Sequence, residues 1–216
     1  MPAWTTGGAA GHAILLGDSI FDNAGYVPGG PDVVRQLCGA LPPDWRASLL
    51  AVDGEVIAGV ERQIRSLPSD ATHLVVSVGG NDALRSAYLL DEKVANVAAA
   101  LVRLSAAQRQ FAAAYDAMLE AVTAVDLPVA VCSIYDTPPG EPNQPVIRTA
   151  LAVFNDCITR AAFSRAVPLI DLRLICDEDA DYANPIEPSV RGGAKIARAV
   201  ASLLTDSELP RSAVVV

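Results

Sequence analysis

The sequence predicts a single α/β domain, built on a five-stranded parallel sheet with helices on both faces. Short apolar, β-branched runs alternate with longer segments of helical periodicity along the chain. The short runs are almost continuously apolar, which is typical of strands buried on both faces of a parallel sheet. The 216 residues, 51% of them hydrophobic, are enough for one large core. We therefore expect one domain over residues 1–216, with its core at about 13–204.

The expected elements follow one another in a regular order. The apolar runs expected as strands are 13–19, 47–54, 72–82, 128–136 and 167–172. Alanine-rich segments with apolar residues at i, i+3 and i+4 are expected as helices over 31–41, 56–66, 92–125, 147–165 and 190–204, the third with a break. The C-terminal residues 211–216 (RSAVVV) are either a frayed tail or an added edge strand.

Composition excludes several classes of function. The net charge of −9 opposes binding to nucleic acid. No apolar run approaches the roughly 18 residues of a membrane span, and the N-terminus lacks the basic segment of a signal peptide. We therefore expect a cytoplasmic protein. The four cysteines are widely spaced and there are only two histidines, so no zinc-binding pattern is present. We expect the cysteines to be small buried residues, and no metal or cofactor.

Polar residues cluster where the expected strands end. Residues 17–19 (GDS), 53–54 (DG), 79–82 (GGND) and 135–136 (YD) each close one of the first four apolar runs. The loop that contains Glu187 follows the fifth run, 167–172. In open parallel sheets, functional residues gather at the carboxyl ends of the strands. These residues are therefore expected along one edge of the sheet.

Two of these segments have a catalytic and a structural interpretation. Ser19 is placed where a nucleophile would be presented at the start of a helix, with main-chain amides nearby. It is equally well explained as a helix N-cap. The side chain of Asn81 could donate to a developing oxyanion, whereas the alternative for residues 79–82 is a plain glycine-rich turn. The pair on two strand ends favours the catalytic interpretation.

Three segments, "LLGDSIFDN", "VVSVGGNDA" and "PIEPSVRGGAKIA", together resemble the GDSL/SGNH hydrolase family in order and spacing over about residues 13–204. The resemblance implies a flavodoxin-like three-layer α/β/α sandwich and ester hydrolysis through a Ser-His-Asp triad. It assigns the nucleophile to Ser19, and the oxyanion hole to the Ser19 N–H and the Asn81 side chain. A third donor in the family is a glycine amide after the second strand. Here the match is loose, with Gly59 as first choice and Gly54 as second.

The last block departs from the family pattern D-x-x-H. Asn184 stands in place of the aspartate and Glu187 in place of the histidine. His12 and His73 open the first and third strands, so each is expected roughly 20 Å from the site, at the opposite edge of the sheet. Either Glu187 is the general base, or the site has none.

Glu187 lies between Pro185 and Pro188, which restrict the backbone and remove two amide donors. If Glu187 is the base, Asn184 can orient it without the repulsion that a second carboxylate would bring. A carboxylate is a weaker base than imidazole by about two pKa units. Burial would raise its pKa, and the following helix N-terminus would lower it. The alternative is a solvated loop acid in a protein that has lost catalysis.

Two functions are consistent with these residues. The first is a serine esterase or acyl hydrolase acting on a small-molecule ester, with catalytic Ser19, Glu187 and Asn184. The second is a catalytically silent binding module for an acylated or glycan ligand. The proline-rich loop 135–145 either borders the substrate cleft or is a rigid connector. For residues 83–107, ordinary amphipathic packing is favoured over a lid. The acyl group, the alcohol and the oligomeric state are left open.

Overall fold

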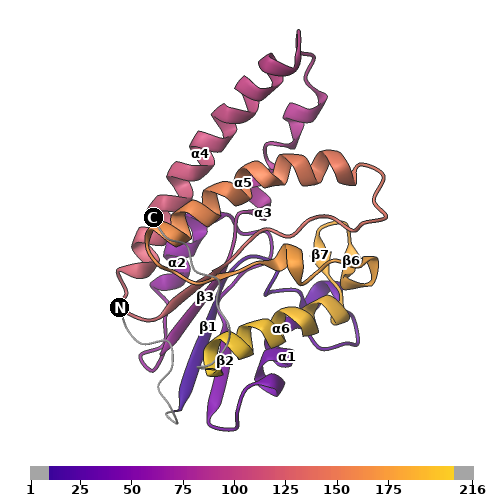
Figure 1. The fold of residues 1–216 in the computed structure, drawn as a ribbon. Helices are drawn as coiled ribbons and strands as arrows, with labels where there is room; N and C mark the ends of the chain where they lie inside the picture. Colours follow the sequence, from indigo (N-terminus) through magenta and orange to yellow (C-terminus); the bar gives the residue numbers. More distant parts are fainter. Residues whose placement is uncertain (1–9, 207–216) are drawn as a thin grey trace.

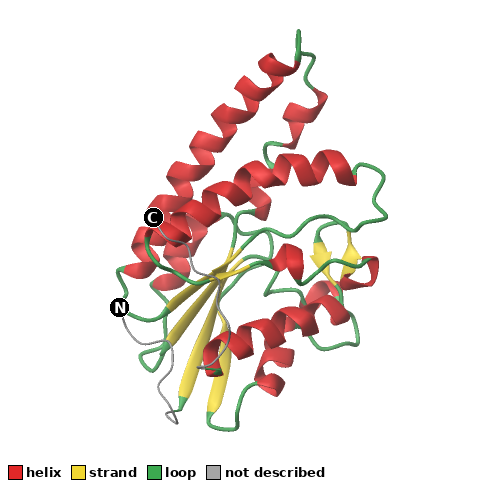
Figure 2. Ribbon diagram, in the orientation of Figure 1, coloured by secondary structure: helices red, strands yellow, loops and turns green. Residues whose placement is uncertain are grey.

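The computed structural model describes residues 10–206, which form a five-stranded parallel sheet in the order β2-β1-β3-β4-β5 (Figures 1 and 2). The strands are β1 (Gly11–Gly17), β2 (Trp45–Leu49), β3 (His73–Ser77), β4 (Val129–Cys132) and β5 (Leu169–Ile170). This order is that of flavodoxin-like folds. The predicted fold class and all five predicted strands are confirmed.

Helices cover both faces of the sheet. They are α1 (Val33–Ala40), α2 (Val60–Ile64), α3 (Gly80–Leu84), α4 (Val97–Thr123), α5 (Gln144–Ser164) and α6 (Val190–Thr205). Helices α1 and α6 pack on one face, and α2, α4 and α5 on the other (Figure 1). Each face has its own apolar cluster, because strands such as β1 are buried on both sides and alternate their side chains between the two. Among the described residues, no helix is long and apolar enough to cross a membrane.

Short 3₁₀ helices lie between these elements: η1 (Ala24–Tyr26), η2 (Ile57–Gly59), η3 (Ala87–Asp91), η4 (Leu172–Leu174) and η5 (Asp179–Asp181). The expected break within residues 92–125 is wrong. Helix α4 runs unbroken for 27 residues, starting where the Asn96 side chain accepts from the Ala99 N–H at 2.9 Å. No glycine or proline interrupts it.

The chain also forms a two-stranded antiparallel hairpin that the sequence pattern does not predict. Its strands are β6 (Tyr182–Asn184) and β7 (Glu187–Pro188), and it lies just before α6. The segments are too short to show any apolar alternation, so periodicity carries no signal for them. The C-terminal residues 211–216, expected as a tail or an edge strand, lie outside the described residues.

Gly17 makes the sharp exit from β1 possible. Its φ is +121°, and a Cβ atom at this position would lie 1.8 Å from the Ser77 carbonyl oxygen. The next residue donates its N–H to that same oxygen at 3.0 Å. A side chain would therefore break the contact that holds the ends of β1 and β3 together.

We expect Gly17→Ala to lower the free energy of unfolding by about 3 kcal/mol or more, because it combines backbone strain with a main-chain clash. Gly39→Ala is a matched control. Gly39 lies in α1 with open space at its Cβ position, and alanine there should be neutral or stabilising by up to about 1 kcal/mol. Urea unfolding followed by circular dichroism measures both. Equal stability of the two variants would contradict this account of the turn.

Candidate active site

A cavity of about 620 Å³ opens at the carboxyl edge of the sheet. Its walls come from the ends of β1, β3 and β4, from the N-terminal part of α5, from the hairpin and from the segment that leads into α4. The lining includes Asp18, Ser19, Asn81, Leu84, Leu90, Ile134, Tyr135, Thr137, Glu141, Ile147, Phe154, Ile186 and Glu187. A largely apolar cavity with a few convergent polar groups is the usual form of a small-molecule site.

Ser19 and Glu187 meet in this cavity. The Ser19 hydroxyl donates to Glu187 Oε1 at 2.9 Å, and both residues are buried. The distance lies in the range that a nucleophile and its general base require. The turn around Ser19 differs from expectation. Ser19 lies in one helical turn, closed by the N–H groups of Phe21 and Asp22 on the Asp18 carbonyl, and not at the start of an α-helix.

The side chain of Gln63, in α2, holds Gly17, the residue that leads into the Ser19 turn. Its side-chain oxygen accepts from the Gly17 N–H at 2.7 Å, and its amide donates to the Gly17 carbonyl at 2.9 Å. Gln63 is buried, so these bonds are not shared with bulk water. The sequence carries no signal for this role, because a single glutamine in a short helix is ordinary surface composition.

The loop that carries Glu187 is held through its carbonyl groups. Tyr135 Oη donates to the Ile186 carbonyl at 2.8 Å, and Thr137 Oγ1 to the Pro185 carbonyl at 3.1 Å. Asn23 Nδ2 donates to the Pro188 carbonyl at 3.2 Å, and Asn23 is fully buried. The two prolines remove donors, and side chains from elsewhere in the fold satisfy the acceptors. Three side-chain hydrogen bonds therefore hold the loop on either side of Glu187.

The expectation that the Asn184 side chain orients Glu187 is wrong. Asn184 Oδ1 accepts from the Ile186 N–H at 2.9 Å, across the turn between β6 and β7. Asn184 and Glu187 are opposite each other in the hairpin, so they are neighbours through the backbone. Asparagine is favoured in such turns because its short side chain bonds to the backbone two residues on. Asn184 thus shapes the turn instead of contacting the carboxylate.

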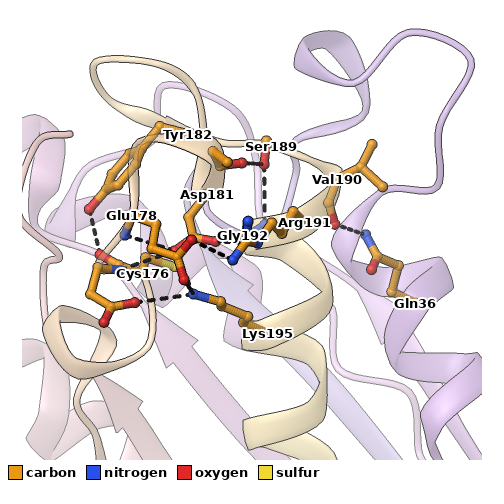
Figure 3. A network of polar contacts seen from close by, with 12 residues as sticks. Gln36, Cys176, Glu178, Asp181, Tyr182, Ser189, Val190, Arg191, Gly192 and Lys195 are labelled. Carbon is orange, nitrogen blue, oxygen red and sulfur yellow. Dashed lines mark hydrogen bonds and ion pairs between the residues drawn. The ribbon is translucent and has the colours of Figure 1, made fainter. Parts of the chain in front are cut away.

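A polar network fixes the other end of the hairpin to α6 (Figure 3). The buried carboxylate of Asp181 accepts from Lys195 Nζ at 2.7 Å and from the N–H groups of Asp177 and Glu178 at 3.1 Å each. The Asp181 carbonyl accepts from the Ser189 N–H at 2.9 Å. Residues on both sides of Glu187 are therefore tied to one helix.

Burial raises the pKa of Glu187 from 4.5 to about 7. The hydrogen bond from Ser19 opposes this increase in pKa, and the negative charge of Asp53 adds to it. The second oxygen, Oε2, is buried and has no hydrogen-bond partner within the described residues. Burial is thus the largest influence on the pKa of Glu187, as a raised value requires. Glu187 therefore changes its charge close to neutral pH.

Asp18 is a second buried carboxyl group in the cavity. Burial raises its pKa to about 8, with further contributions from the charges of Glu187 and Asp82, although its Oδ1 accepts from the Ile20 N–H at 3.2 Å. At pH 7 Asp18 is therefore mainly neutral. This leaves Glu187 as the carboxyl group beside Ser19 that ionises first as the pH rises.

Two of the three expected oxyanion-hole donors line the cavity, namely Ser19 and Asn81. The Ser19 N–H makes no hydrogen bond within the described part of the chain. Asn81 Nδ2 donates one N–H to the Glu55 carbonyl at 2.9 Å, and an amide group has a second N–H to offer. The same bond ties the loop after β2 to α3.

The assignment of Gly59 to the oxyanion hole is wrong. Its N–H donates to the Val56 carbonyl at 2.9 Å in a 3₁₀ turn, and the residue is outside the cavity lining. Gly59 instead makes room for Glu55, whose side chain would clash with a Cβ atom there. Gly54, the second choice, has φ +76° and no hydrogen bond from its N–H within the described residues, but it does not line the cavity either.

Both histidines lie at the opposite edge of the sheet, as expected. His12 is the second residue of β1, where its ring contacts Ser48 Oγ at 2.8 Å and Asp70 Oδ1 at 3.1 Å. His73 is the first residue of β3, and its ring packs on Trp45. Both are buried, so their role is structural.

Two segments with open interpretations line the cavity. The proline-rich loop contributes residues from Tyr135 to Asn143, which confirms that it borders the cleft. Residues from Ala83 to Asp91, together with Leu104, form another wall. Ordinary amphipathic packing, the interpretation that the sequence favours, therefore does not fully describe residues 83–107, because part of this stretch lines the cavity.

The fold is shared with several solved structures at low sequence identity. An extracellular lipase from Streptomyces rimosus is 17% identical and superposes with a TM-score of 0.64, covering 90% of this chain and 98% of that one. A phospholipase A1 from Streptomyces albidoflavus is 18% identical with a TM-score of 0.64, covering 91% and 98%. A lipolytic G-D-S-L family protein from Veillonella parvula is 18% identical with a TM-score of 0.63, covering 93% and 100%. At such identities the likeness shows the fold.

A comparison with curated proteins found no match. A family model, in contrast, matches residues 15–194, which is most of the chain and includes Ser19, Asn81 and Glu187. The match supports ester hydrolysis as the general activity. This chain belongs to the GDSL-like lipase/acylhydrolase family.

Proposed function

We propose that this protein is a serine ester hydrolase in which Ser19 is the nucleophile and Glu187 the general base. The observation that carries the proposal is the 2.9 Å hydrogen bond from Ser19 Oγ to Glu187 Oε1 inside the cavity. A pKa of about 7 for Glu187 supports it, because a base works best when its pKa is near the working pH. This value is close to the 6.5 of an ordinary imidazole, which is the base that the family pattern has at this position.

The reaction proceeds in two steps. Ser19 Oγ attacks the ester carbonyl carbon while its proton passes to Glu187, and the negative charge that develops on the carbonyl oxygen is held by the Ser19 N–H and the Asn81 amide. Collapse of this intermediate breaks the bond to the alcohol, which takes the proton back from Glu187. Water then attacks the acyl-enzyme with Glu187 again as the base, and the acid is released. The mechanism requires no cofactor.

The alternative is a silent binding module for an acylated or glycan ligand. Such a module has no need for a buried carboxylate that accepts from the serine hydroxyl and leaves its second oxygen unpaired. An unpaired buried oxygen costs stability, and it is understandable where the group must take up a proton. The Ser19–Glu187 contact therefore supports the hydrolase over the binding module. Hydrolysis of short nitrophenyl esters, together with labelling of Ser19 by a phosphonate, tests this choice.

Asp53 offers a test of Glu187 that leaves both catalytic groups in place. Its negative charge raises the pKa of Glu187, and its carboxylate accepts from Tyr26 Oη at 3.0 Å. We expect Asp53→Asn to move the acidic limb of kcat/KM to lower pH, because the neutral side chain no longer opposes ionisation of Glu187. Asp44→Asn, at an exposed position outside the cavity lining, is the control. An unchanged limb in Asp53→Asn would argue against Glu187 as the titrating base.

A further inference from the structure

The segment between α3 and the middle of α4 projects from the body of the protein (Figure 1). We call residues 84–104 the arm; it includes η3 and the first two turns of α4. Seven of the twelve large apolar side chains that are exposed in the described residues lie in the arm: Leu84, Tyr88, Leu90, Val94, Val97, Leu101 and Val102. Isolated exposed apolar residues are ordinary, but a concentration of them marks an interaction surface.

The first turns of α4 are apolar on every side. Residues 97–102 read VAAALV, and Val97, Leu101 and Val102 are 75%, 60% and 68% exposed. A helix that is apolar all round is normally covered. Within residues 10–206 nothing covers these three side chains.

The apolar surface of the arm continues into the cavity. Leu84 and Leu90 belong to the arm and also line the cavity, and they are 46% and 51% exposed. The arm and the cavity that holds Ser19 therefore share apolar side chains.

Charge indicates what kind of partner fits. The arm contains three basic and two acidic residues, and Arg103 Nη1 pairs with Glu92 Oε2 at 3.3 Å. The rest of the chain contains 13 basic and 23 acidic residues. A nearly neutral apolar arm on a strongly negative body suits a surface without net charge, because an anionic surface would repel the body. A second copy would bring a second negative body close.

We propose that the arm docks the protein on the surface of a zwitterionic lipid aggregate. The exposed apolar side chains enter the interface, as those of amphipathic interfacial helices do, and the exposed Tyr88 adds an aromatic ring of the kind that is favoured there. The mouth of the cavity then faces the lipid. The docking itself is independent of the proposed hydrolysis, whereas the idea that a lipid acyl ester enters the cavity rests on it.

Flotation with phosphatidylcholine vesicles tests the docking. We expect the wild-type protein to float with the vesicles, and the triple variant Val97→Gln/Leu101→Gln/Val102→Gln to bind weaker by on the order of tenfold or more, because three apolar side chains no longer leave water. Glutamine keeps the helix propensity of these exposed positions. The control is Leu174→Gln, which changes an 80% exposed leucine on the body and should float as the wild type does. Vesicles rich in phosphatidylglycerol should bind the wild type less at low salt, with partial recovery as salt screens the repulsion.

Hydrolysis of a short, water-soluble nitrophenyl ester separates this proposal from the proposed function. The triple variant should keep wild-type kcat/KM on it, because none of its three positions lines the cavity. If neither the wild type nor the triple variant hydrolyses any ester, but the wild type still floats, the proposed function fails and the docking stands. Absence of wild-type flotation, or equal flotation of wild type and triple variant, overturns the docking. A wild-type dimer in light scattering that the triple variant loses, with no flotation of either, would instead assign the arm to self-association.

Discussion

Ser19→Ala is expected to abolish ester hydrolysis while leaving the fold intact. The substitution removes only the hydroxyl group, whose hydrogen bond goes to Glu187 in the cavity. Loss of a serine nucleophile typically lowers kcat by roughly 10⁴-fold or more, down to what binding and oxyanion stabilisation alone provide. Turnover of nitrophenyl acetate by purified protein measures the effect.

Ser86→Ala provides the matched control. Ser86 lines the same cavity, and its side chain has no hydrogen bond to Glu187. Its loss should leave kcat within a few-fold of the wild type. Circular dichroism first checks that Ser19→Ala unfolds at the same temperature as the wild type. Undiminished turnover in that folded variant would show that Ser19 is not the nucleophile.

Glu187→Gln is expected to lower kcat/KM by on the order of 10²- to 10⁴-fold, the usual contribution of general acid-base catalysis. Glutamine can still accept the hydrogen bond from Ser19, but it cannot take the proton. In the wild type, activity should fall as the pH drops through about 7, because burial raises the pKa of Glu187 to that value and only the ionised form is a base. The residual activity of Glu187→Gln should lack this limb.

The same variant has a second readout, in stability. The pKa of Glu187 is raised from 4.5 to about 7 by folding, so between these values the unfolded chain has already lost the proton that the folded protein keeps. The contribution of Glu187 to the stability of the folded state is therefore fully present below about pH 4.5, and it is lost as the pH rises towards 7. Glu187→Gln should remove this loss and be more stable than the wild type at pH 8 by up to about 3 kcal/mol, with little difference at pH 4.

Thermal unfolding at the two pH values measures the difference. A Glu187→Gln protein with normal turnover and unchanged stability at pH 8 would leave Glu187 as a loop acid with no part in the chemistry. A Glu187→Gln protein that is inactive but more stable than the wild type is the expected result if Glu187 is held in an unfavourable environment for its function.

The sequence by itself determined the fold and the edge of the sheet that holds the candidate site. Continuous apolar runs mark strands buried on both faces, and this signal is local, so all five strands were predictable. Their carboxyl ends meet at one edge in any parallel sheet, which placed Ser19 and Asn81 together and both histidines at the far edge. The three segments that resemble the family supplied the hydrolase activity as an expectation.

Only the tertiary structure decided how the site is built. Ser19 and Glu187 are 168 residues apart, and their contact depends on a hairpin whose strands are too short to leave a periodic pattern. Gly59 matched the family spacing loosely, but its N–H is used in a local turn that spacing does not reveal. The direction of the shift in the Glu187 pKa could not be read from neighbours in sequence, because the shift comes mainly from burial. The loop is held in its buried position by bonds from Asn23 and Tyr135, which are distant in the chain. Periodicity is local and can be read from the chain, whereas desolvation and hydrogen-bond partners are properties of the packed molecule.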